Sequence, residues 1–159
     1  MKKTLLLACL IVAGNHSIQA EEKWYKYERL YLQAGTFIHF SSSDDHDGSS
    51  LLLGLEAVKS NGWLYGLALF DNSFGQFSQY AYVGKNWNFS GKMENFHAKL
   101  TAGIIHGYKE PWDDKIPFNS SSGWAPGLVP SFGYKKDRFG ADIVLLGNSG
   151  LLFTVGTDF

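Results

Sequence analysis

The feature that most constrains the fold is a stretch of regular alternation from Trp63 to Trp87. From Trp63 to Phe70 every second side chain falls on the same face, and both faces are largely apolar. A period of two is typical of a β-strand, and a polar turn followed by a second such run predicts a hairpin. A strand with two apolar faces indicates that one face meets lipid and that the other meets a packed core or an apolar ligand. The turn carries Asp71, Asn72 and Ser73, a set that ordinary turn chemistry also explains.

The rest of the chain repeats this alternation often enough to predict eight strands, an even number, each near the length of a tilted membrane strand. On four of these strands a consistently apolar face opposes a face with isolated polar residues, namely His39, Lys99, Asp142 and Asp158. The chain ends in Phe159 after apolar residues at alternate positions, which resembles the recognition signal of outer-membrane barrels. We therefore predict an all-β fold, an eight-stranded antiparallel up-and-down transmembrane β-barrel, with a soluble β-sandwich as the alternative. The expected strands are Leu30–Phe40, Ser50–Lys59, two within Trp63–Trp87, Phe96–Tyr108, Gly127–Tyr134, Phe139–Leu146 and Leu151–Phe159.

The N-terminus predicts export. Met1 to Ala20 has two lysines followed by an apolar run too short to span a membrane, so we expect a signal peptide cleaved after Ala20. The segment ending at Cys9 faintly resembles a lipoprotein signal, but the apolar run continues past it. Residues 21–159 then form a single barrel domain without cysteine, located in the outer membrane of a Gram-negative cell. Loss of Lys2 and Lys3 takes the formal net charge from −1 to −3, which argues against a nucleic-acid partner.

Barrel topology brings the chemically interesting residues to one rim. Bacterial barrels begin and end in the periplasm and have short turns there. The connections 41–49, 71–76, 109–125 and 147–150 should therefore be extracellular. His39, at the outer end of the first strand and facing inward, is expected at the same rim as Asp71, Asn72 and Ser73.

A histidine, a hydroxyl and a carboxylate are the groups that activate an oxygen for acyl transfer. Ordinary loop polarity is the commoner explanation of such a set. The loop Asp44–Asp47 could bind a divalent cation, but it lacks the spacing of a known calcium loop, so a solvated loop is favoured and no metal site is predicted. His97 and Lys99 are expected to satisfy the polar interior of their strand.

Pro126 and Pro130 are unusual, because proline cannot donate to a strand ladder and a closed barrel has no edge strand. A bulge or a late start of the strand is one explanation. The functional alternative is a lateral gap through which a lipid chain enters the barrel. We then expect an acyl-sized cavity in the outer half, lined by inward residues such as Gly35, Phe37, Gly66 and Ala68.

Several short stretches, in their order and spacing over about residues 36–159, resemble the lipid A palmitoyltransferases of the PagP type. This resemblance implies an outer-membrane barrel, acting as a monomer without a cofactor, that moves palmitate from a phospholipid donor to lipid A. It implies His39, Ser73 and either Asp71 or Asn72 at the catalytic rim, with Pro126 and Pro130 beside a lateral opening for substrate. The stretches are Phe37–His39, Leu64–Tyr65, Phe70–Ser73, Asn95–His97, Thr101–Gly103, Ile116–Pro117, Pro126–Pro130 and Phe132–Tyr134.

With two departures from the family pattern, this chain resembles a shortened, divergent member of that family. The family has aspartate directly before the serine, whereas here Asn72 precedes Ser73 and Asp71 lies one residue earlier. The family also begins with an amphipathic helix, and the segment Glu21–Arg29 is too short for one. Two other functions stay open: deacylation of lipid A by the same residues, and a non-catalytic small barrel that binds lipid or a partner.

Overall fold

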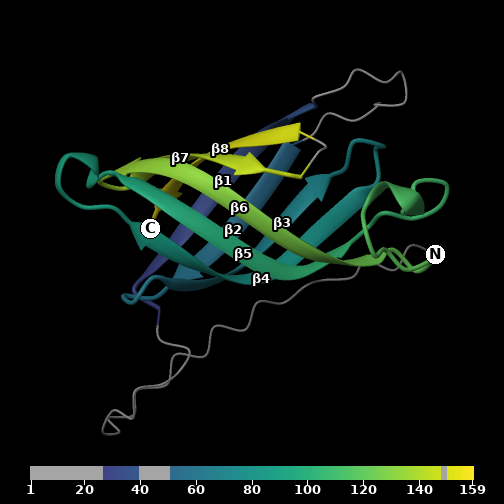
Figure 1. Ribbon diagram of the computed structural model, residues 1–159, viewed down its shortest axis with the longest axis horizontal. Helices are drawn as coiled ribbons and strands as arrows, with labels where there is room; N and C mark the ends of the chain where they lie inside the picture. Colours follow the sequence, from purple (N-terminus) through teal and green to yellow (C-terminus); the bar gives the residue numbers. More distant parts are fainter. Residues whose placement is uncertain (1–26, 40–50, 148–149) are drawn as a thin grey trace, which may run out of the picture.

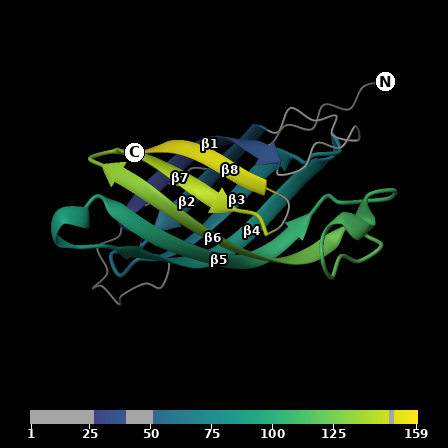
Figure 2. The same cartoon turned by 45° about the horizontal axis from the view of Figure 1, so that its top comes forward.

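The computed structural model describes residues 27–39, 51–147 and 150–159, except for the side chain of His39. Within these residues the chain forms a closed barrel in which each strand pairs with the next and β1 pairs with β8 (Figures 1 and 2). Every pairing is antiparallel, so the eight-stranded up-and-down barrel predicted from the alternation is confirmed. The predicted signal peptide, residues 1–20, and the candidate cation loop Asp44–Asp47 lie outside the described residues.

The strands are of unequal length, which matters for the site below. Two short 3₁₀ turns, Gly91–Met93 and Asp113–Lys115, are the helical segments of the described chain, and neither is long or apolar enough to cross a membrane. The strands are β1 Arg29–His39, β2 Leu51–Val58, β3 Trp63–Asp71, β4 Phe77–Asn88, β5 Phe96–His106, β6 Trp124–Lys136, β7 Phe139–Leu145 and β8 Gly150–Asp158.

The barrel closes along the ladder between β1 and β8. We call the end at which β1 begins, at Arg29, and β8 ends, at Asp158, the terminal rim; it lies at the left of Figure 1. The backbone N–H of Phe159 donates to the carbonyl of Leu30 at 3.1 Å, so the last residue takes part in closure. The opposite end, which carries the connections 72–76 and 107–123, is called the loop rim.

The outer face is apolar along most of its height. Because inward and outward side chains alternate along every strand, these exposed side chains cannot pack into the barrel's own core. Such a surface suits a lipid environment, with aromatic residues near both rims. Exposed outward residues include Leu53, Leu55, Trp63, Leu67, Phe77, Val83, Trp87, Ile104, Trp124, Leu128, Ile143 and Val155.

The expected start of the sixth strand is wrong. The sequence placed it at Gly127, whereas β6 begins at Trp124 and pairs with β5 from His106 downward. The prolines did not end this strand because the ladder with β5 continues through both of them, as Ile104 faces Pro126 and Leu100 faces Pro130. A late start of the strand therefore does not explain Pro126.

Candidate functional site

The half of the barrel next to the loop rim is hollow. Its cavity has a volume of about 130 Å³, roughly ten times the ~10–15 Å³ that a cavity needs in order to hold one water molecule. Most of its wall is apolar, so it suits a hydrocarbon chain better than a polar ligand. Among the residues expected to line it, Phe37 and Ala68 do so, together with Leu52, Phe70, Ile105, Val129, Val144 and Leu152.

The two glycines expected to line the cavity do not create room for a ligand. A Cβ at Gly66 would lie 2.6 Å from the ring of Tyr82, and a Cβ at Gly35 would lie 2.7 Å from Cγ2 of Thr154. Their missing side chains therefore accommodate neighbouring side chains. That part of the cavity prediction was wrong, because the sequence alone does not show which side chain crosses above a glycine.

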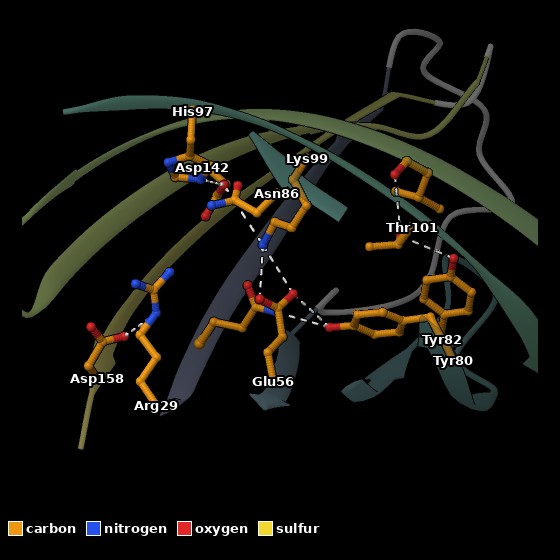
Figure 3. A network of polar contacts seen from close by, with 12 residues as sticks. Arg29, Glu56, Tyr80, Tyr82, Asn86, His97, Lys99, Thr101, Asp142 and Asp158 are labelled. Atoms are coloured by element: carbon orange, nitrogen blue, oxygen red, sulfur yellow. Dashed lines mark hydrogen bonds and ion pairs between the residues drawn. The ribbon is translucent and has the colours of Figure 1, made fainter. Parts of the chain in front are cut away.

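Below the cavity, a charged network crosses the barrel interior (Figure 3). The Lys99 ammonium donates to both carboxylate oxygens of Glu56, at 3.0 and 3.1 Å, and lies 4.0 Å from Asp142. Nε2 of His97 is 2.8 Å from Oδ1 of the same aspartate. All four residues are buried. This confirms that His97 and Lys99 satisfy the polar interior.

Two further side chains complete the network from other strands. Tyr82 on β4 donates to Glu56 at 3.0 Å, and Gln33 on β1 donates to Glu56 and to the Tyr82 hydroxyl, each at 3.3 Å. Glu56 and Lys99 line both the large cavity and a second pocket of about 20 Å³ nearer the terminal rim. The Glu56–Lys99 pair is therefore the partition between the two spaces.

At the cavity mouth lie three of the predicted site residues. Asp71 is the last residue of β3, and Asp71, Asn72 and Ser73 all line the cavity. Asp71 is exposed at this mouth, whereas Asn72 is only 2% exposed. The structure thus brings the predicted hydroxyl and carboxylate to the entrance of the apolar space.

Asn72 is a turn-forming residue. Its Oδ1 accepts hydrogen bonds from the backbone N–H groups of Phe74 and Gln76, both at 3.0 Å. Its Nδ2 donates to Ser78 at 3.1 Å and to Gln76 at 3.4 Å. An amide carries no titratable proton, and this one is occupied within its own turn. Of the two candidates for the acidic role, Asp71 is therefore the one with suitable chemistry.

His39 ends β1 at the loop rim, where its backbone lies opposite Gly150 on β8. This places the strand end at the same rim as Ser73, as the topology predicted. The His39 side chain lies outside the described part of the structure, so its pairing with Ser73 stays a prediction.

The connection 107–123 contributes a tyrosine to the cavity wall. Tyr108 lines the cavity, and burial raises the pKa of its hydroxyl to about 12, so it remains a neutral donor at physiological pH. Asn119 holds this loop by donating to the carbonyls of Tyr108 and Asp113, both at 2.8 Å.

Strand pairing in the barrel wall stops beside the two prolines. β6 pairs with β5 along 11 positions, from Phe96–Tyr134 to His106–Trp124, but it pairs with β7 only from Ser131 to Lys136. Among the residues that the structure describes, 124–130 of β6 therefore have no strand partner on the β7 side. We call this region the β6–β7 gap. It lies in the loop half, at the height of the cavity residue Val129.

Strand geometry explains why the ladder stops there. The N–H of Lys135 donates to Asn95, towards β5, so even-numbered residues of this unbulged strand direct their N–H towards β7. Continuing the β6–β7 register beyond the Ser131–Val144 pair would set Pro130 opposite Leu145. Pro130 has no N–H to form that rung, and Pro126 lacks one at the same side farther along. The two prolines therefore occupy positions of β6 at which a backbone N–H would otherwise be directed towards β7.

Sequence analysis missed several residues that shape the site. Glu56 was the one charged residue on the inward face of its strand, and that signal could have marked it as a partner for Lys99. Gln76, Tyr82 and Tyr108 had no such signal, because their contacts come from strands or loops far along the chain.

No known family model and no curated protein matches this sequence. A solved structure described as "De novo design of transmembrane beta-barrels" is similar, with a TM-score of 0.59, 10% sequence identity, and coverage of 84% of this chain and 98% of that one. At this identity the likeness concerns the fold alone. The chain is an eight-stranded antiparallel up-and-down barrel of the transmembrane type.

Proposed function

We propose that this protein is an outer-membrane acyltransferase that moves an acyl chain, palmitoyl in the first instance, from a glycerophospholipid to lipid A. The observation that carries the proposal is the apolar cavity whose mouth is lined by Ser73 and Asp71 and whose wall lacks strand pairing beside Pro126 and Pro130. A barrel that only anchors a protein or fills its own core needs neither a hollow half nor a lateral gap. The resemblance to the PagP-type family supports the same conclusion.

Three features support the proposed location. The predicted secretory signal over residues 1–20, the apolar outer face and the transmembrane-type barrel favour the outer membrane of a Gram-negative cell, with the loop rim towards the outside. Lipid A lies in that outer leaflet. Both lipids would then be beside the gap, and the protein would act as a monomer.

The chemistry is an exchange of one ester for another, so it balances without a cofactor. The bond between the donor acyl carbon and its glycerol oxygen breaks, and a bond to a lipid A hydroxyl forms. His39 would take the proton from the attacking hydroxyl and return it to the glycerol oxygen as the lysophospholipid leaves. Ser73 is the essential hydroxyl, either as a transient acyl carrier or as a group beside the direct attack, and Asp71 orients the imidazole.

The decisive measurement is mass spectrometry of lipid A from cells with and without the protein. We expect one added acyl chain, lost in His39→Ala and in Ser73→Ala, because a general base or an essential hydroxyl contributes about 10²–10⁴-fold or more. Ser90→Ala, at an exposed turn near the terminal rim, is the matched control and should retain activity. Heat-modifiable migration on gels confirms folding of each variant.

The other outcomes identify the rival functions. Lipid A that loses a chain indicates a deacylase using the same rim. Lipid A that does not change indicates a non-catalytic barrel, and activity retained in Ser73→Ala shows that the proposed site is wrong.

A further inference from the structure

The turn that carries Ser73 is fastened to the long connection 107–123, which contributes none of the proposed catalytic residues. Nε2 of Gln76 donates to the carbonyl of Lys109 at 3.1 Å, and its Oε1 accepts the backbone N–H of Lys109 at 3.0 Å. One side-chain amide thus pairs with both polar groups of one backbone residue, as a neighbouring strand would.

The same amide also reaches the residue before Ser73. Oε1 of Gln76 accepts from Nδ2 of Asn72 at 3.4 Å, and the Gln76 backbone N–H donates back to Oδ1 of Asn72 at 3.0 Å. Asn72 is buried, and both its Oδ1 and its Nδ2 form hydrogen bonds with nearby residues 74–78. Gln76 therefore connects Asn72 to the backbone of the long connection.

The residue after Ser73 is fixed by a different contact to the same connection. The ring of Phe74 stacks on Trp112, with centroids 4.4 Å apart and an interplanar angle of 12°. Ser73 thus lies between two anchored neighbours, Asn72 on one side and Phe74 on the other. Both contacts end on the connection 107–123, at Lys109 and Trp112, and neither of these two residues is a proposed reacting group.

We propose that Gln76 is a positioning residue, which holds the Ser73 turn against the connection 107–123 so that the hydroxyl keeps its place at the cavity mouth. This inference rests on the function proposed above and adds to it a residue that acts through Ser73 without touching substrate. Its amide joins the two loops that border the mouth, Tyr108 lining the wall on one side and Ser73 on the other. Misplacement of a reacting group by about 1 Å can cost on the order of 100-fold in rate, so a loose turn lowers kcat while the cavity still binds the acyl chain.

The test compares Gln76→Met with Gln79→Met in the full-length protein reconstituted in phospholipid vesicles with lipid A. Methionine keeps the length of glutamine and removes its hydrogen bonds. Gln79 lies three residues after Gln76, and its side chain contacts His106 on β5. It is therefore a matched control outside the turn. We expect Gln76→Met to lower kcat about tenfold or more with KM within about twofold, and Gln79→Met to keep both. Gln76→Glu retains an acceptor for the Lys109 N–H and should restore part of kcat.

Amide hydrogen exchange gives a readout that does not depend on activity. The Lys109 N–H should exchange faster in Gln76→Met than in the unsubstituted protein, while amides of β4 and β5 stay protected. Faster exchange at Lys109 with unchanged kcat overturns the proposal, because the loops would be coupled without positioning Ser73. A rise in KM at constant kcat also overturns it. Absence of acyl transfer in the unsubstituted protein overturns the proposed function and this inference together.

Discussion

The two halves of the barrel interior are built from the same strands but have opposite character. β5 directs His97 and Lys99 into the terminal half and Ile105 into the loop half. In the same way, β2 directs Glu56 into the terminal half and Leu52 into the loop half. The terminal half holds buried polar side chains that bond across the barrel, beside a pocket of only about 20 Å³. The loop half is apolar and hollow. The comparison teaches that one alternating pattern can build both a bonded polar interior and an apolar cavity, depending only on which side chains occupy the inward positions.

The largest effect should come from breaking the charged pair in the terminal half. Lys99→Met leaves Glu56 buried without its cation, and loss of one partner of a buried ion pair costs about 3–5 kcal/mol. Urea unfolding of the protein in lipid vesicles measures this loss. Lys92→Met, at an exposed turn, is the control and should change little. Adding Glu56→Gln to Lys99→Met removes the unpaired charge and should recover part of the stability; a double variant as weak as the single one would show that packing, not charge, is responsible.

A smaller loss of stability is expected at the second buried pair. Asp142→Asn weakens the 2.8 Å contact with His97, and hydrogen bonds to charged groups contribute about 1.5–3 kcal/mol. The same unfolding experiment measures it. Acyl transfer should stay within about twofold, because neither residue lines the large cavity and the effect of a distant change is usually independent. A severe loss of activity without loss of stability would contradict the division between the two halves.

Filling the cavity in the loop half should lower acyl transfer with a limited effect on stability. Ala68→Leu adds three carbons at the cavity wall, and a difference of one methylene group in an apolar pocket is worth about 10–200-fold in rate. We expect at least tenfold less transfer of long acyl chains, with a loss in the free energy of unfolding no larger than the ~1–3 kcal/mol that added methylenes cost in a packed core, since Ala68 lines the cavity. Ala102→Leu, on the outward face of β5, is the control. Equal transfer by Ala68→Leu and the unsubstituted protein would show that the acyl chain does not occupy this cavity.

The smallest effect is expected at the β6–β7 gap. Pro130→Ala supplies the N–H that would face Leu145, and one more backbone hydrogen bond contributes about 0.5–1.5 kcal/mol to closing the gap. Transfer should then fall about two- to tenfold, in step with that free energy, as measured by initial rates in vesicles. Pro117→Ala, in the connection 107–123, is the control. An unchanged rate would indicate that lipids reach the cavity by another route.

Much of the fold followed from local pattern, whereas the interior network did not. Alternation in every strand predicted the closed barrel, and strand parity alone brought the end of β1 to the same rim as Ser73. The Glu56–Lys99 contact joins residues 43 positions apart, and it depends on the tilt of strands that a sequence pattern does not specify. The turn role of Asn72 was within reach of the sequence, since Oδ1 accepts from the backbone N–H groups of Phe74 and Gln76, but the contact of Gln76 with Lys109, 33 positions away, was not.

The Glu56–Lys99 partition has a consequence for the cell that hosts the barrel. A hollow tube through the outer membrane would conduct ions and admit small toxic solutes, yet here the hollow part ends at a charged cross-wall joined to Tyr82 and Gln33. In the proposed outer-membrane location, this cross-wall would separate the cavity half from the periplasmic end of the barrel. Electrical recording from a planar bilayer should accordingly show no steady conductance, and a cell that makes much of this protein should keep its permeability barrier.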